Sequence, residues 1–174
     1  MRRILDTLYA LSGGLSALFI CLICVLVCTQ VTFNIITKVG LFGLNLTIPS
    51  YADFAGYFLA TSSFLALAYT LQKGGHIRVT LLTSAVGDRF RFVLEIFALA
   101  ISAGATLFAV FYMARLTRDS LEFGDVSSGI IAIPLYIPQV AVLVGLAIFA
   151  IALLDLLIQT ILAGRPVIEN ISTE

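Results

Sequence analysis

Charged side chains are scarce in this sequence of 174 residues, because Asp, Glu, Lys and Arg together make up only 11% of it. A water-soluble domain is about 25% charged, since charged and polar groups must cover its surface. The apolar set AVILMFWYC instead accounts for 60% of the chain. This composition excludes an ordinary soluble domain, and it also excludes a disordered chain, which is poor in apolar residues. We therefore predict an integral membrane protein with one domain, residues 1–174.

The sequence also lacks an excess of either charge sign, with ten basic side chains against ten acidic ones. A nucleic-acid partner is excluded on this ground, because such proteins use a basic face to neutralise phosphates. There is one histidine and no tryptophan, and no nucleotide, haem or zinc signature is present. We predict no catalytic residue, cofactor or metal ion in this chain, and hence no enzyme.

Four long runs free of charge divide the chain. A bilayer-crossing helix needs about 20 mostly apolar residues, and a transmembrane β-strand would alternate polar and apolar positions, which these runs do not. The uncharged runs cover residues 7–37, 54–72, 96–114 and 126–154. A fifth run, 39–52, is short and interrupted by glycine, asparagine and proline. The sequence thus predicts an all-α membrane protein with four transmembrane helices, near residues 13–37, 51–72, 90–114 and 138–162.

The distribution of Lys and Arg predicts the orientation of these helices, since basic residues favour the cytoplasmic side. Seven of them lie in the N-terminal segment, the 73–91 loop and the C-terminal tail, and three lie in the other two loops. We therefore expect both termini in the cytoplasm. The loops 38–50 and 115–137 would face the outside, and the second is acidic through Asp119, Glu122 and Asp125.

Local sequence signals predict where two of the helices begin. Ser50 followed three residues later by Asp53 has the spacing of a capping box, in which both side chains bind backbone N–H groups of the first turn. Pro134 and Pro138 lie four residues apart, and proline is tolerated in the first turn of a helix. The last helix should begin near one of them. We expect the preceding residues to dip into the membrane interface, with 127–129 as a flexible entry.

The loop after the second helix has its own pattern. Gly74 and Gly75 are typical of a helix end. Apolar residues then recur at helical spacing over 77–86 with basic residues around them, which predicts a short amphipathic helix in the cytoplasmic interface. Its basic residues, Arg78 among them, would meet anionic lipid headgroups, and His76 is interpreted as a polar interfacial residue.

Cys21, Cys24 and Cys28 form a C-x-x-C-x-x-x-C pattern in the first helix. In a loop this pattern would indicate a redox pair or a metal site. In hydrocarbon a thiolate is costly, and cysteine there serves as a small apolar packing residue. We favour the packing role.

The acidic residues within the predicted helices all lie near helix ends. Glu95 is four residues from Arg91, which favours an ion pair at the interface, and Asp155 lies about two turns from the end of the fourth helix, where it could also meet a basic residue such as Arg91. Proton- or ion-moving transporters usually carry a carboxylate or histidine inside the span. If this chain works in transport, we expect another protein to supply the pathway.

Small residues four apart recur in each predicted helix and provide surfaces for close helix packing. The pairs are Gly13 and Ala17, Gly56 and Ala60, Ala100 and Gly104, and Ala141 and Gly145.

The motifs on either side of the third helix resemble those of one family, the DctQ family, which comprises the small membrane subunits of TRAP (tripartite ATP-independent periplasmic) transporters. The first motif is the loop Gly74-Gly75-His76-Ile77-Arg78-Val79. The second runs from Ser128-Gly129 through Ile133-Pro134-Leu135-Tyr136-Ile137-Pro138 to Gly145. Asp53 with Tyr57 resembles the acidic start of the family's second helix, and the resemblance covers about residues 34–159.

This resemblance implies a non-catalytic subunit of a secondary transporter in the bacterial or archaeal cytoplasmic (inner) membrane. Its expected partners are a large membrane subunit, which binds substrate and sodium, a periplasmic substrate-binding protein, and membrane lipids. The small subunit would scaffold the large one and help to receive the binding protein. Asp119, Glu122 and Asp125 are the residues we expect to contact that protein.

Two other functions remain open at this point. One is a free-standing four-helix membrane transporter, which the lack of a carboxylate in the middle of a span disfavours. The other is a membrane thiol oxidoreductase that uses Cys21 and Cys24.

Overall fold

The computed structural model describes residues 2–39, 46–73 and 88–163, and these residues form four helices. The helices are α1 (Arg2–Val39), α2 (Tyr51–Gln72), α4 (Asp88–Phe123) and α5 (Tyr136–Ala163). All four are long and apolar enough to cross a membrane. The prediction of an all-α protein with four spans is therefore confirmed for the described part of the chain.

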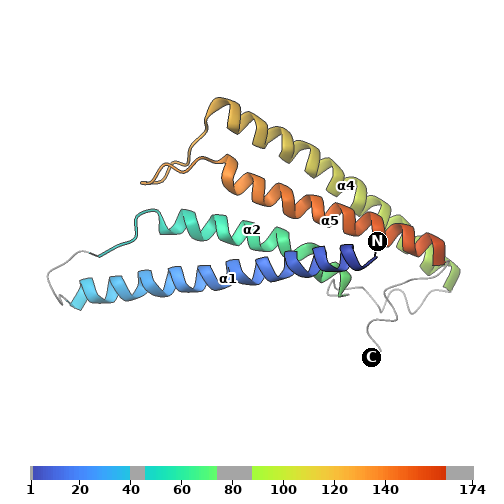
Figure 1. Cartoon of the computed structure of the whole chain (residues 1–174), viewed down its shortest axis with the longest axis horizontal. Coiled ribbons are helices and arrows are strands. Elements are labelled where there is room, and N and C mark those ends of the chain that lie inside the picture. Colours follow the sequence, from blue (N-terminus) through green and yellow to red (C-terminus); the bar gives the residue numbers. More distant parts are fainter. Residues whose placement is uncertain (1, 40–45, 74–87, 164–174) are drawn as a thin grey trace.

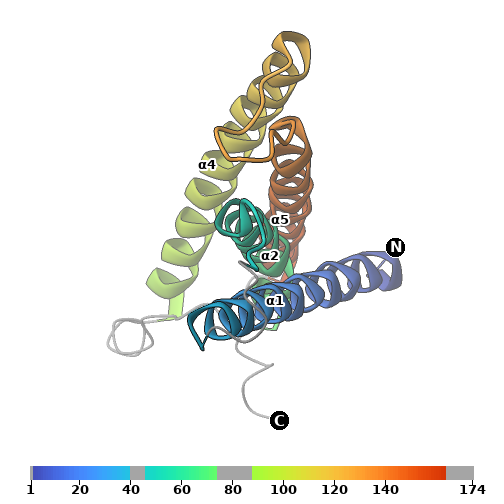
Figure 2. The same ribbon diagram turned by 90° about the vertical axis from the view of Figure 1, so that its left-hand side faces the viewer.

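The helices pack in the order α1, α2, α5, α4, so that α2 and α5 lie inside the row and α1 and α4 lie at its two edges (Figure 1). Viewed along the long axis of the molecule, α1 and α4 are inclined to one another on opposite sides of the inner pair (Figure 2). Successive helices alternate in direction, which places the start of α1 and the end of α5 at the same end of the molecule (Figure 1). That this end faces the cytoplasm stays a prediction.

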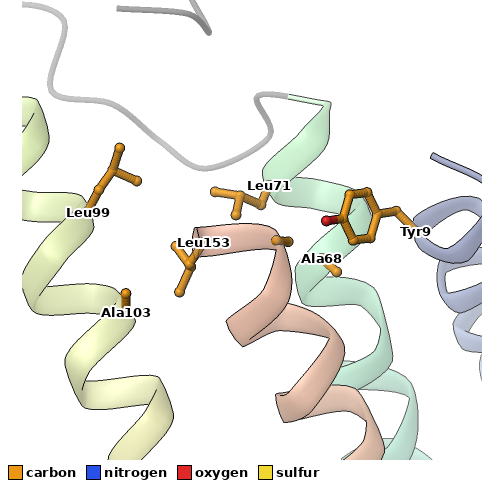
Figure 3. Close-up of a cluster of buried hydrophobic side chains, with 7 residues drawn as sticks. Tyr9, Ala68, Leu71, Leu99, Ala103 and Leu153 are labelled. Carbon is orange, nitrogen blue, oxygen red and sulfur yellow. The ribbon is translucent and has the colours of Figure 1, made fainter. Parts of the chain in front are cut away.

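All four helices meet in one apolar cluster at this end, which we call the closed end (Figure 3). The buried members of the cluster are Tyr9, Ala68, Leu71, Leu99, Ala103, Ala152 and Leu153. Towards the other end, which we call the open end, α1 and α4 diverge (Figure 1). The bundle is thus fastened at one end, and the loops at its open end must be positioned by other contacts.

Two glycines allow neighbouring helices to approach closely. A β-carbon on Gly145 of α5 would lie 2.8 Å from the carbonyl carbon of Phe64 in α2. A β-carbon on Gly13 of α1 would lie 2.7 Å from Cγ of Tyr69, also in α2. Gly56 and Gly104 would have nothing within 4 Å of such a carbon. Two of the four predicted small-residue pairs therefore serve packing within this chain, and the glycines of the other two face open space.

Serine side chains join α1 to α2 through hydrogen bonds in the buried interface. The Ser16 and Ser62 hydroxyl oxygens lie 3.0 Å apart, and Ser62 Oγ also lies 3.1 Å from the Ser16 carbonyl oxygen, to which it can donate. Ser12 Oγ donates to the carbonyl oxygen of Leu65. In a membrane each such bond contributes about 0.6 kcal/mol, so the three contacts together help to fix the pairing of these two helices.

The helix bounds agree with the sequence prediction for α2 and differ for two others. α1 begins at Arg2, eleven residues before the predicted start at 13, because Gly13 lies inside the helix against Tyr69 and does not interrupt it. α4 continues to Phe123, nine residues past the predicted end at 114. Charged residues end the apolar run there without ending the helix. The predicted amphipathic helix at 77–86, with Gly75, His76 and Arg78, lies outside the described residues.

Candidate functional site

The two described connections at the open end carry most of the residues that the sequence singled out. We call residues 46–53 and 124–135 together the loop platform. It contains Asp53, Asp125 and Pro134, and it lies beside Asp119 and Glu122 at the end of α4 and Pro138 in the first turn of α5. Three sets of hydrogen bonds hold the platform in place. The first comes from α1, the second from the residue before α2, and the third lies within the loop 124–135.

The first support is Gln30 of α1, whose side chain is only 4% exposed. Its Oε1 accepts a hydrogen bond from the backbone N–H of Ile48 at 2.8 Å. Its Nε2 lies 3.2 Å from the Thr47 hydroxyl oxygen and 3.2 Å from Oδ1 of Asn34, and it can donate to both. One buried amide thus satisfies polar groups of the 46–50 segment that would otherwise lie unpaired against an apolar helix.

The second support is Ser50, and here the capping-box prediction is wrong. Ser50 precedes α2 as predicted, but its side chain makes no capping hydrogen bond, and its backbone has a φ of 57°, in the left-handed region. Its Oγ instead accepts a hydrogen bond from the backbone N–H of Ile131 at 3.0 Å. A partner 81 residues away in the sequence therefore replaces the local cap.

Asp53 also contacts the second loop. It lies in the first turn of α2, where a carboxylate is favourable to the helix dipole. A β-carbon built on Gly129 would overlap Oδ2 of Asp53 and would lie 2.7 Å from Oγ of Ser50. The absence of a side chain at position 129 is thus what allows the loop 124–135 to rest on the start of α2.

The third support lies within the loop, which folds back on itself as a short hairpin. Val126 pairs with Pro134, and the N–H of Leu135 donates to the carbonyl oxygen of Asp125 at 2.9 Å. The N–H of the buried Ser127 donates to the Ile133 carbonyl oxygen at 2.8 Å, and Ser127 Oγ accepts from the Ile133 N–H at 3.2 Å. Ser127 thus joins the two arms of the hairpin, and the expectation of a flexible entry at 127–129 stays a prediction.

The hairpin is fixed to both helices that it connects. Gly124, with a φ of 68°, ends α4 in the conformation that favours glycine. Gln139 of α5 donates through Nε2 to Oγ of the buried Ser120 in α4 at 3.0 Å. The carbonyl oxygen of Pro134 accepts from the N–H of Ile137 at 3.2 Å, directly before Pro138. α5 begins at Tyr136, two residues from each proline, so the prediction that the last helix begins near one of them is confirmed.

The predicted contact acids lie beside this fixed hairpin. Glu122 and Asp125 are exposed and Asp119 is half-buried. The hairpin itself contains no lysine or arginine, and Asp125 is its one charged residue. The exposed Arg115 and Arg118 lie further down α4, nearer the apolar part of the helix. The hairpin and the adjoining end of α4 therefore present a locally acidic surface, while Lys38 in the last turn of α1 is a basic residue at the same end.

The remaining predicted residues lie elsewhere. Cys21, Cys24 and Cys28 are free thiols on the exposed surface of α1. Asp155 is half-buried in α5 and accepts a hydrogen bond from Nε2 of Gln159 at 2.7 Å, whereas the side chain of Arg91 lies outside the described residues. Within the described ranges, no three His, Cys, Asp or Glu side chains lie close enough together to hold a metal ion.

Comparison with known families decides the identity. The family of tripartite ATP-independent periplasmic transporters, DctQ component, matches residues 23–163, which is well over half of the chain. The chain belongs to the DctQ family. As a DctQ protein it is a membrane component of a transporter, and the family is not one of enzymes. No curated protein and no solved structure gives a significant match.

Sequence reasoning missed Gln30, Ser127 and the Ser120–Gln139 pair as residues that build this surface of the DctQ protein. Each is a polar side chain inside or next to an apolar run, and a buried polar group must find a partner. That requirement predicts that a contact exists. It does not predict the partner. The Ser127 contact joins two arms of one hairpin, whereas the Gln30–Ile48 and Ser120–Gln139 contacts join different segments of the chain.

Proposed function

We propose that this DctQ protein is the small scaffold subunit of a TRAP-type secondary transporter. It would pair with a large membrane subunit that carries out sodium-coupled uptake of an organic acid or a similar solute, delivered by a periplasmic substrate-binding protein. The observation that carries the proposal is the family match over residues 23–163. The placement of charge supports it, because charged side chains of the described helices lie within about two turns of a helix end.

The exposure of the helices also supports a scaffolding role. In the apolar windows of the edge helices α1 and α4, 11% and 17% of the residues are buried, against 28% in α2 and in α5. The edge helices therefore offer long apolar faces to a neighbouring subunit or to lipid. Sodium would bind in the partner, and we propose no cofactor in this chain. The proposed location is the cytoplasmic (inner) membrane of a bacterium or archaeon, with both termini in the cytoplasm.

In this arrangement the loop platform faces the periplasm, and Asp119, Glu122 and Asp125 are placed to meet the binding protein. Charges at the rim of an interface mainly speed the encounter of two proteins. Changing all three acids to lysine should therefore slow uptake roughly tenfold at low salt, with an unchanged amount of protein in the membrane. Uptake by cells or proteoliposomes that contain the complete system measures this.

The neutral variant with Asp119→Asn, Glu122→Gln and Asp125→Asn is the matched control. It should fall between the wild type and the lysine variant, and raising the salt concentration should reduce the differences, because salt screens exposed charges. Equal uptake by all three proteins at low salt would exclude the acids from binding-protein recognition.

A further inference from the structure

The hairpin of the loop platform exposes a large apolar side chain at its tip. Ile130 is 86% exposed, the highest value for a large apolar residue in the part of the chain that the structure describes. Phe123 and Val126, at the base of the hairpin, are 78% and 54% exposed. Single exposed apolar side chains are common, but several of them on one short segment mark a surface that binds a partner or a membrane.

This tip is held in place and does not need to be ordered on binding. Ser127 ties the two arms of the hairpin, and the N–H of Ile131, next to the tip residue, donates to Ser50 Oγ at 3.0 Å. Gly129, the residue before Ile130, lies directly against the Asp53 carboxylate. A side chain presented on a preorganised loop contributes more to affinity, because less conformational entropy is lost when it binds.

The charge around the tip distinguishes a protein partner from a lipid surface. Segments that insert into a membrane interface are rich in lysine and arginine, which attract anionic headgroups. Here the hairpin has Asp125 as its one charge, and Asp119 and Glu122 precede it. The hairpin also extends past the adjoining ends of α4 and α5 along the long axis of the bundle, and α1 continues further in the same direction (Figure 1). An apolar tip with an acidic base fits a soluble protein with a small apolar hollow and a basic rim.

We propose that Ile130 is the apolar anchor with which this subunit binds the periplasmic substrate-binding protein, and that Ser50, Asp53 and Gly129 position it. This rests on the proposed function and adds the residue that holds the partner once the acids have attracted it. A few central apolar side chains usually carry most of the affinity of an interface, and they act mainly by slowing dissociation.

The test uses the complex of this chain with its large subunit in nanodiscs, with the periplasmic substrate-binding protein of the same transporter as the soluble probe. Ile130→Ser should weaken binding about tenfold or more through faster dissociation, while Ile130→Val should bind nearly as the wild type does. Leu162→Ser is the matched control, because Leu162 is 81% exposed at the closed end. It should leave binding unchanged.

A second pair of variants tests the positioning of the tip. Gly129→Ala introduces a β-carbon that overlaps the Asp53 carboxylate, so it should displace the tip and weaken binding. In the Gly129→Ala protein, the second change Asp53→Ala removes the carboxylate and should restore much of the lost affinity for the substrate-binding protein. A variant that had merely unfolded the loop would not recover.

Three results would overturn the inference. Equal dissociation rates for the wild type, Ile130→Ser and Leu162→Ser would show that the tip makes no contact with the binding protein. Loss of the large subunit from the Ile130→Ser complex would assign the tip to that subunit, and quenching of a fluorophore attached at position 130 by quencher-labelled lipids would assign it to the membrane. The proposed function fails separately, if the wild-type chain does not copurify with a large membrane subunit.

Discussion

Replacing Gly145 by leucine should separate α5 from α2 and destabilise the bundle by about 3 kcal/mol, towards the upper part of the usual cost of overpacking. A β-carbon at this position would meet the carbonyl carbon of Phe64 at 2.8 Å and the backbone nitrogen of Leu65 at 3.0 Å. These are backbone atoms of a helix, so neither can rotate away as a side chain could. Because α5 also packs against α4, its displacement should weaken both the α2–α5 and the α4–α5 contacts.

Gly104→Leu is the matched control, since a β-carbon on Gly104 has nothing within 4 Å. It makes the same chemical change in another membrane-spanning helix, on an open face. Denaturation of the purified chain in detergent, followed by circular dichroism and by limited proteolysis, measures both variants. Equal unfolding midpoints for the two leucine variants would contradict the packing of α5 on α2.

Replacing Gln30 by leucine should release the 46–50 segment from α1. The leucine side chain has a similar size but leaves the N–H of Ile48 and the hydroxyl of Thr47 without the amide that binds them. An unsatisfied polar group costs about 1–3 kcal/mol, so the amide hydrogen of Ile48 should exchange with solvent at least about tenfold faster. Hydrogen exchange on the purified chain, read at the peptide that contains Ile48, measures this.

Thr32→Val provides the comparison for this prediction. Thr32 is exposed on the same helix, and its hydroxyl donates within that helix to the carbonyl oxygen of Cys28 at 2.8 Å. Its loss should leave exchange at Ile48 unchanged. If Gln30→Leu also left that exchange unchanged, the platform would be held by contacts other than the buried amide.

The fold was largely predictable, because the sequence has few charges and they lie near the ends of the membrane spans. For α2 the charge of Lys73 marks the end of the helix, and the Ser50 signal marks its start, since Asp53 lies inside the first turn. Charge did not mark the helix bounds of α1 and α4, since a charged residue ends the stretch that hydrocarbon can accommodate but does not end a helix in water or at the interface. In α4 the charges Arg118 and Glu122 lie four apart, a spacing that is compatible with a continuing helix.

The loop platform was less predictable, because its contacts join segments far apart in the chain. The spacing of Ser50 and Asp53 is a sound local signal for a capping box. In the folded chain Ile131 takes the serine oxygen and Gly129 takes the space beside the carboxylate. Local patterns describe what a residue can do for its own helix; a tertiary contact replaced that role at Ser50, while Asp53 keeps its place in the first turn and also contacts the second loop.

The proposed role as a scaffold depends on the claim that this DctQ protein supports a transport pathway without containing one. Reconstitution into liposomes, with a sodium gradient, a substrate and the substrate-binding protein, tests the claim most directly. We predict no uptake with this chain alone, no uptake with the large subunit alone, and sodium-dependent uptake when both are present. Sodium-driven uptake by the purified chain alone would contradict the account.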